Sequence, residues 1–261
     1  MSLEQREVPI LEYDAKSKPI VDARAYADAF YSNRKDIKRC IFTYFTDIVD
    51  QYERELKLNQ VFRMRTEGYR PRVYEMQVGK EHIYVLPMPI GAPQAARMME
   101  ILAAIGVEKF MVCGGAAVLG GDNIGEKIMV PTSAVRDEGV SYHYLPPARE
   151  VQMNAAVRTK ILETLKDEKI EFVEVKTWTT DAIFRETVDK VELRKAEGCN
   201  TVEMECAAFY SVAKHLGLLC GQLLYTADVV SKKGWDYRDW HTKTESRAQL
   251  FDLAVKCLMK L

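Results

Sequence analysis

Residues 202–228 read VEMECAAFYSVAKHLGLLCGQLLYTAD and contain a complete strand–helix–strand pattern. The end of a strand at Val202 leads into an apolar helix, which stops at Gly217 because glycine suits the C-terminus of a helix. A buried strand from Leu219 to Thr226 follows and leads directly to Asp228. This alternation predicts strands of a central sheet that helices cover on both faces.

The same alternation runs through the rest of the chain. Apolar periodicity, glycines and prolines predict strands at 73–76, 82–86, 109–113, 127–131 and 170–177, and helices at 91–105, 151–165, 187–197 and 244–261. Nearer the N-terminus, apolar residues recur at spacings of three and four from Ile37 to Leu56 and predict one long helix. We therefore expect a single α/β domain over residues 1–261.

Composition excludes several classes of function. Of the 261 residues, 48% are hydrophobic and 29% charged, which is typical of a globular protein, and the formal net charge is -1. A net charge this close to zero provides no positive electrostatic field that would attract nucleic acid or an anionic membrane. No apolar run approaches the length of a membrane span. The N-terminus lacks an apolar signal-peptide core, so we expect a cytoplasmic protein.

The cysteines and histidines give no sign of a metal site. The six cysteines form no Cys-x-x-Cys pair, and the four histidines are scattered along the chain. Free thiols among apolar residues behave as small hydrophobes and suit a reducing compartment. We therefore expect no bound metal.

Two acids flank Met204 at the start of the apolar helix. Glu203 and Glu205 would be costly to bury without polar partners, and a pair of ribose hydroxyls would be such a partner. A solvated helix start explains the same pattern, because glutamate suits the positive end of the helix dipole. These residues alone do not decide between the two interpretations.

Asp228 follows a buried strand, and open α/β sheets place ligands outside the carboxyl ends of their strands. An aspartate there is a candidate general acid. It is an equally good candidate for the cap of a helix or turn.

Glycines follow two of the predicted strands, at Gly91 and at Gly114–Gly115. Without a Cβ, such positions let backbone N–H groups approach a bound anion or sugar. Turns without any ligand give the same pattern. The chain contains neither Gly-x-Gly-x-x-Gly nor Gly-Lys-Ser/Thr, which argues against binding of dinucleotides and nucleoside triphosphates.

Taken together, these segments resemble the nucleoside phosphorylase I family, which includes purine nucleoside phosphorylases, uridine phosphorylases and related nucleosidases. Four stretches carry the likeness: 90–93 leading to 102–106, 113–117, 135–144 and, most specifically, 202–208. Residues 179–182 and Asp228 match in order and spacing. The likeness covers roughly residues 73–260, which leaves 1–72 as a divergent N-terminal helical region. The resemblance implies a three-layer α/β/α fold with a mixed, curved central sheet.

The resemblance also implies roles for individual residues. Met204 and Glu205 would line the ribose, and Asp228 matches the acid of members that cleave purine nucleosides. Ile183 and Phe184 occupy the positions that pack on the base. No metal or organic cofactor is implied, and members usually form dimers or assemblies of dimers with a neighbouring subunit reaching into the site.

The phosphate site departs from the family pattern. Phosphorylases usually carry Arg before the second glycine segment and Ser or Thr within it, where this chain has Val112 and Gly115. The N-terminal Gly-Asp-Pro loop with its Arg is not visible either. Backbone N–H groups of Gly91 and Gly115 would then bind phosphate, helped by arginines of the loop at 63–72. The candidates in that loop are Arg70 and Arg72, and weaker candidates are Arg136 and Arg185.

The sequence thus predicts a nucleoside phosphorylase that cleaves a purine nucleoside with phosphate and releases free base and ribose 1-phosphate. Three alternatives stay open: a uridine phosphorylase, a nucleoside hydrolase that uses water, and, more remotely, a non-catalytic nucleoside-binding protein. The expected partners are nucleoside, phosphate and further copies of the chain.

Overall fold

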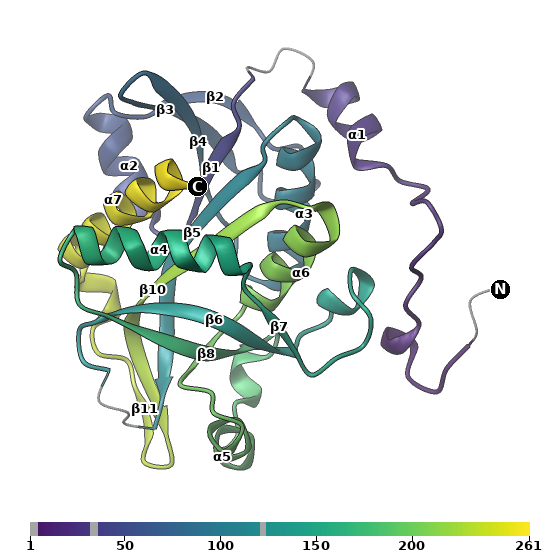
Figure 1. The fold of residues 1–261 in the computed structure, drawn as a ribbon, viewed down its shortest axis with the longest axis vertical. Coiled ribbons are helices and arrows are strands. Elements are labelled where there is room, and N and C mark those ends of the chain that lie inside the picture. Colours follow the sequence, from purple (N-terminus) through teal and green to yellow (C-terminus); the bar gives the residue numbers. More distant parts are fainter. Residues whose placement is uncertain (1–4, 32–35, 121–123) are drawn as a thin grey trace.

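The longest strands of the sheet, β5 (Lys109–Leu119) and β10 (Leu219–Ser231), lie side by side at its centre. The computed structural model describes residues 5–31, 36–120 and 124–261 (Figure 1). Its other strands are β1 (Arg39–Thr43), β2 (Asn59–Arg63), β3 (Arg72–Val78), β4 (Glu81–Pro87), β6 (Ile128–Asp137), β7 (Glu150–Gln152), β8 (Phe172–Thr180), β9 (Thr201–Glu203) and β11 (Gly234–Asp236).

The strands form one mixed sheet in the order β11-β10-β6-β8-β9-β5-β1-β4-β3-β2, with β7 on β6. Because β10 also pairs with β5, the strands β10, β6, β8, β9 and β5 close on themselves. The pairings β1–β4, β1–β5, β5–β10, β6–β8 and β8–β9 are parallel, whereas β9 runs antiparallel to β5 and β10 antiparallel to β6. The predicted α/β fold with a mixed, curved sheet is confirmed.

Helices cover the sheet as the alternating pattern predicts. They are α1 (Ala23–Phe30), α2 (Thr46–Arg54), α3 (Ala92–Ala104), α4 (Ala155–Asp167), α5 (Val188–Ala196), α6 (Cys206–Leu216) and α7 (Thr244–Lys260). Figure 1 shows the pairs α3 with α6 and α4 with α7 on either side of the central strands. The short 3₁₀ turns are η1 (Pro9–Leu11), η2 (Ser141–His143), η3 (Ile183–Arg185) and η4 (Trp240–Thr242).

The predicted long helix from Ile37 to Leu56 is wrong over its first part. Residues 39–43 form β1, which lies between β4 and β5, and only α2 is helical. Cys40, Ile41, Phe42 and Thr43 are all buried because both neighbouring strands and both sheet faces enclose them. A short apolar run buried on every side fits helix and strand spacing equally well. Within residues 1–72, β1 and β2 therefore accompany the helices.

The glycines at 114 and 115 lie inside β5, not at a turn after it. A Cβ on Gly115 would lie 2.8 Å from the Cβ of Ala227, and one on Gly114 would lie 3.0 Å from the Tyr44 ring. Two neighbouring segments therefore press against the strand where it has no side chains. These glycines allow close backbone approach within the sheet.

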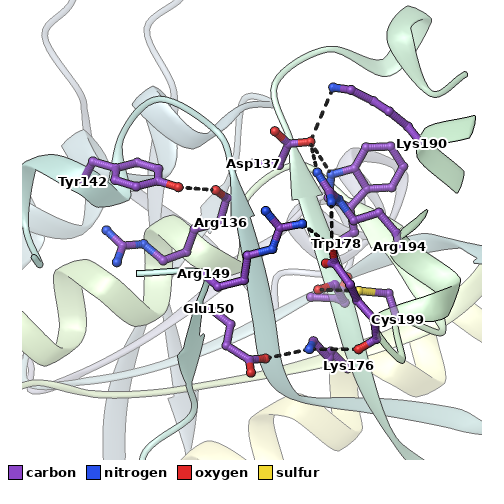
Figure 2. A network of polar contacts seen from close by, with 12 residues as sticks. Arg136, Asp137, Tyr142, Arg149, Glu150, Lys176, Trp178, Lys190, Arg194 and Cys199 are labelled. Atoms are coloured by element: carbon purple, nitrogen blue, oxygen red, sulfur yellow. Dashed lines mark hydrogen bonds and ion pairs between the residues drawn. The ribbon is translucent and has the colours of Figure 1, made fainter. Parts of the chain in front are cut away.

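A network of polar contacts fixes α5 on the sheet (Figure 2). Asp137 on β6 accepts hydrogen bonds of 2.9 Å from the Trp178 indole of β8 and 2.9 Å from the buried Arg194 guanidinium of α5. Burial raises the pKa of Asp137, but Arg194 and Lys190 outweigh burial and leave that pKa below its ordinary value. The network therefore holds the segment between β8 and α5 in place.

We expect Asp137→Ala to lower the free energy of unfolding by on the order of 2 kcal/mol, since it leaves the buried Arg194 without its aspartate. The loss should be smaller than for a fully buried pair, because the Asp137 side chain is 30% exposed. Urea denaturation would measure it. Asp189→Ala, an exposed acid in the first turn of α5, is the control. Equal midpoints for the two variants would contradict this role for the network.

Candidate active site

The Glu203 side chain accepts free backbone N–H groups at the start of α6. One oxygen of its buried carboxylate accepts the backbone N–H groups of Glu205 at 2.7 Å and Cys206 at 2.6 Å, and the other accepts the Thr179 hydroxyl at 2.5 Å and the Thr177 hydroxyl at 3.4 Å. Free N–H groups at a helix start need such an acceptor. Of the two interpretations of this segment, the helix start is thus correct for Glu203, although the residue is buried and not solvated.

Glu205 faces away from α6 towards the connection between β4 and α3. Its carboxylate accepts the backbone N–H of Gly91 at 2.6 Å. Gly91 has a φ of 108°, a left-handed conformation that favours glycine. Burial, and then the charge of Glu203, raise the pKa of Glu205 above the ordinary range of a glutamate. The adjacent Met204 is half-buried. Hydrogen bonds with Gly91, Tyr44 and the Met204 backbone therefore lower the pKa of Glu205, but they do not offset its burial and the Glu203 charge.

Tyr44 lies beside Glu205, and sequence reasoning missed it. Its ring packs on Gly114, and burial together with the Glu205 charge raises the pKa of its hydroxyl well above the ordinary value. Tyr44 directly follows β1, the strand that the sequence pattern assigns to a helix. Had β1 been predicted as a strand, Tyr44 would have been expected at the carboxyl ends of the strands, where ligands bind.

Asp228 approaches the same edge from β10. A bulge at Ala227 shifts the register, so that Asp228 lies opposite Ala117 of β5, and Ala117 in turn lies opposite Val202 of β9. Two strand spacings separate the backbones of Asp228 and Val202 by about 10 Å. The structure thus brings Asp228 and the Glu203–Glu205 segment together across one strand.

The Asp228 carboxyl is half-buried, and burial raises its pKa. Its Oδ2 accepts the indole N–H of Trp235 at 2.6 Å. Trp235 belongs to the aromatic segment at 235–240, which follows β10 through a hairpin. The hairpin therefore holds one carboxyl oxygen, and no described residue donates a hydrogen bond to Oδ1.

The predicted base-binding residues lie on η3, at the end of β8. Ile183 is 52% exposed and Phe184 96% exposed, so neither contributes to a closed pocket within the chain. Glu186 is the first residue after η3, and the sequence analysis did not identify it as a site residue. Burial and the neighbouring Asp228 raise the pKa of Glu186 to about 7.

The candidate arginines differ in their surroundings. Arg72 forms ion pairs of 2.9 Å with both Asp50 and Glu53. Arg70 is exposed and lies in the wall of a cavity of about 540 Å³, which is also lined by Tyr26, Phe30, Arg65, Pro89, Gln94 and Arg97. Pro89 is two residues from Gly91, so the cavity and the Glu205 site lie close to the same connection.

The weaker candidates do not meet at the site. The Arg136 guanidinium is buried and donates to Ser141 and to the backbone carbonyls of Leu145 and Pro146. Figure 2 shows it beside Tyr142, whose hydroxyl donates to the Arg136 carbonyl. Arg185 is exposed on η3. Arg136 thus contributes to the structure of the β6–β7 connection.

Within the described part of the chain, no three His, Cys, Asp or Glu side chains gather as metal ligands would. None of the helices in these same ranges combines the length and apolar composition needed to cross a membrane.

Two buried glutamates and a half-buried aspartate thus lie near the strand ends of a mixed sheet, where α/β folds commonly bind their ligands. A family model described as the phosphorylase superfamily matches residues 47–258. The chain belongs to this superfamily, whose members are enzymes.

Curated relatives of the chain are nucleoside phosphorylases. It is 28% identical over 134 residues to a guanosine phosphorylase of Halorubrum lacusprofundi, a match that covers 51% of this chain and 56% of that protein. It is 29% identical over 189 residues to a uridine phosphorylase of Thermococcus kodakarensis, covering 65% and 67%. The chain thus spans little more than half the length of the first relative.

Solved structures share the fold at low sequence identity. An AMP nucleosidase from Bacteroides thetaiotaomicron superposes with a TM-score of 0.72 at 16% identity, covering 91% of this chain and 96% of the other. A uridine phosphorylase from Vibrio fischeri gives a TM-score of 0.71 at 21% identity, covering 89% and 100%. At these identities the likeness concerns the fold alone.

We expect Glu205→Gln to raise the thermal stability of the protein at pH 8. An unfolded glutamate ionises near pH 4.3, whereas Glu205 in the fold holds its proton to higher pH. Between these pKa values the folded state binds more protons, so the free energy of unfolding of the unsubstituted protein falls as pH rises. Removing the ionisable group removes this loss.

Melting curves between pH 5 and pH 8 would measure the effect. At pH 8 the variant should melt a few degrees higher, the shift that roughly 1 kcal/mol produces in a domain of this size. The two proteins should converge at pH 5. A variant that melts lower than the unsubstituted protein across the whole range would show that Glu205 stabilises the fold as a carboxylate.

Proposed function

We propose that the chain is a nucleoside phosphorylase that cleaves the N-glycosidic bond of a purine nucleoside with phosphate, releasing free base and ribose 1-phosphate. The observation that carries this proposal is the placement of Glu205 and Asp228 on two sides of β5. A separation of about 10 Å between these strand ends suits a nucleoside, with its sugar at one acid and its base at the other.

Glu205 holds the sugar. Ribose hydroxyls donate to its carboxylate and add to the hydrogen bonds with Gly91, Tyr44 and Met204 that only partly offset the burial of this group. As the bond from C1′ to the base breaks, the ribose gains positive charge, which a nearby carboxylate stabilises. The half-buried side chain of Met204, between Glu203 and Glu205, packs beside the sugar.

Asp228 acts on the leaving base. The electron pair of the broken bond moves into the base, and a proton from Asp228 Oδ1 to purine N7 neutralises it. Burial favours the protonated acid by raising its pKa. Ile183 and Phe184 pack on the base, and their exposure supports an assembly of dimers in which a second subunit covers them.

Phosphate attacks C1′ from the side of the two glycines. Gly91 and Gly115 supply backbone N–H groups, for which the Gly91 N–H would have to leave Glu205, and Arg70 supplies a guanidinium that no carboxylate of the described residues pairs with. Arg72 is the second candidate and would have to leave Asp50 and Glu53. The reaction needs no metal or organic cofactor in this proposal.

Hydrolysis is the second candidate reaction. The ion pairs of Arg72 and the fully buried Val112 favour it, because they leave the phosphate position with little positive charge. A uridine phosphorylase is the alternative for the base, supported by the relative from Thermococcus kodakarensis.

We expect Asp228→Asn to reduce turnover of purine nucleosides by roughly 10²–10⁴-fold, the contribution of a general acid. The fold should persist, since the amide can still accept the Trp235 hydrogen bond. Release of free base, followed by ultraviolet absorbance, measures the loss. Purine turnover unchanged in the folded variant would remove Asp228 from the mechanism.

The product separates phosphorolysis from hydrolysis. With phosphate present, ribose 1-phosphate should accumulate, and Arg70→Ala should raise the phosphate concentration needed for half-saturation by about tenfold or more, as loss of a charge-assisted hydrogen bond does. Arg63→Ala is the matched control, because Arg63 is an exposed arginine outside the wall of the cavity. Free ribose, formed at a rate indifferent to phosphate, would establish the hydrolase instead.

A further inference from the structure

Three arginines line the cavity of about 540 Å³ that lies between α1, the loop at 63–72 and the first turns of α3, namely Arg65, Arg70 and Arg97. No carboxylate of the described residues forms an ion pair with any of them. Glu67 is the only acid in the described part of the wall, so positive charge exceeds negative charge there. Guanidinium groups that gather without carboxylate partners favour an anionic ligand.

The backbone of Arg65 is held in place by three hydrogen bonds. Its N–H donates to the Tyr31 hydroxyl at 2.7 Å. Its carbonyl accepts the Tyr26 hydroxyl at 2.7 Å and the Arg97 guanidinium at 3.3 Å. The Arg65 guanidinium lies over the Phe30 ring, 5.1 Å from the ring centroid. Arg65 and Arg97 are therefore neighbours on fixed backbone, which reduces the entropy lost when they bind a ligand.

The cavity adjoins the Glu205 site through the connection between β4 and α3. Pro89 and Gln94 line the cavity and lie on either side of Gly91, whose N–H donates to Glu205. The strands β10, β5, β1 and β4 run parallel in this spatial order, so their carboxyl ends lie at one edge of the sheet. Three strand spacings separate β10, which carries Asp228, from β4, a distance of about 14 Å.

Glu205 lies between the two ends of this row. Strands β9 and β1 both pair with β5 on the side away from β10, and β9 leads directly into Glu205. Asp228, Glu205 and the cavity therefore follow one another along the edge of the sheet. A ligand long enough to contact Asp228 and Glu205 and extend past Gly91 reaches the arginines.

We infer that this cavity binds a phosphate group on O5′ of the sugar, so that the substrate class is purine nucleoside 5′-monophosphates. The inference rests on the proposed function, which places the base at Asp228 and the ribose hydroxyls at Glu205. C5′ is attached at the end of the sugar ring away from C1′ and the base, which is the end towards the cavity. Arg65 and Arg97 bind the phosphate oxygens, because the planar guanidinium fork matches their geometry.

The inferred site is distinct from that of the attacking phosphate. The attacking phosphate has to reach C1′ from Gly91 and Gly115, and Gly115 lies within β5. The O5′ phosphate lies farther from β5, on the other side of the β4–α3 connection, where Arg65 and Arg97 are. It takes no part in the bond changes and stays on the sugar product.

Calorimetric binding of formycin and formycin 5′-monophosphate tests the inference without turnover. Both are C-nucleosides, whose glycosidic carbon–carbon bond cannot be cleaved, and they differ only in the O5′ phosphate. The unsubstituted protein should bind the monophosphate about tenfold or more tightly, as a charge-assisted hydrogen bond provides. The buffer contains no inorganic phosphate, which would compete for the arginines.

Arg97→Ala and Arg65→Ala should each remove most of this preference and leave formycin affinity within about twofold, because only the monophosphate loses a partner. Arg97→Lys keeps the positive charge without the planar fork and should retain part of the preference. Arg63→Ala removes an exposed arginine outside the wall of the cavity and should behave as the unsubstituted protein.

Equal affinity of the two probes for the unsubstituted protein, which a site for free phosphate alone would give, would overturn the inference. So would a preference that persists in both alanine variants, equal losses for both probes in these variants, or no binding of either probe. The proposed function fails by a different result, namely the expected preference without cleavage of any purine nucleoside or its monophosphate. Purine nucleosides cleaved with no advantage from an O5′ phosphate would leave the function standing and remove the inferred site.

Discussion

The hydrogen bonds that Glu203 accepts at the start of α6 are the constraint on which the site depends. They fix the first turn of a helix whose every residue from Cys206 to Ala213 is buried. Together with hydrogen bonds from two threonine hydroxyls, they occupy both oxygens of the Glu203 carboxylate. Glu205 accepts the Gly91 N–H and has hydrogen bonds with Tyr44 and the Met204 backbone, yet burial still raises its pKa. A buried carboxylate in that condition is costly for the fold, and a polyhydroxyl ligand relieves the cost.

A second constraint sets the distance between the two acids. Ala227 bulges out of β10 and presses against β5, which is possible because residue 115 has no side chain. Bulges commonly re-aim a side chain next to a site, and this one places Asp228 opposite Ala117. Gly115 therefore shapes the acid end of the site through packing. Its proposed contact with phosphate would be an additional role.

The sequence predicts the elements whose pattern is local. Helix α3 and the β9–α6–β10 unit have clear periodicity and glycine stops, so their positions and the place of Glu205 follow from it. Strand β1 lacks such a pattern, because a run buried on all sides has no polar face that would distinguish strand spacing from helix spacing. The place of Tyr44 in the site was missed for the same reason, because Tyr44 directly follows β1. Glu186 was missed because the charge of Asp228, more than forty residues away, contributes to its raised pKa, and no local pattern records that proximity.

We expect Glu205 to bind a proton in the ligand-free protein, because burial raises its pKa, and to release that proton when ribose hydroxyls donate to its carboxylate. Calorimetry near pH 7, in two buffers of different ionisation enthalpy, measures that proton directly with a C-nucleoside whose glycosidic carbon–carbon bond cannot be cleaved. We expect net proton release by the unsubstituted protein and none by the Glu205→Gln variant. Tight binding with no proton released by the unsubstituted protein would contradict it.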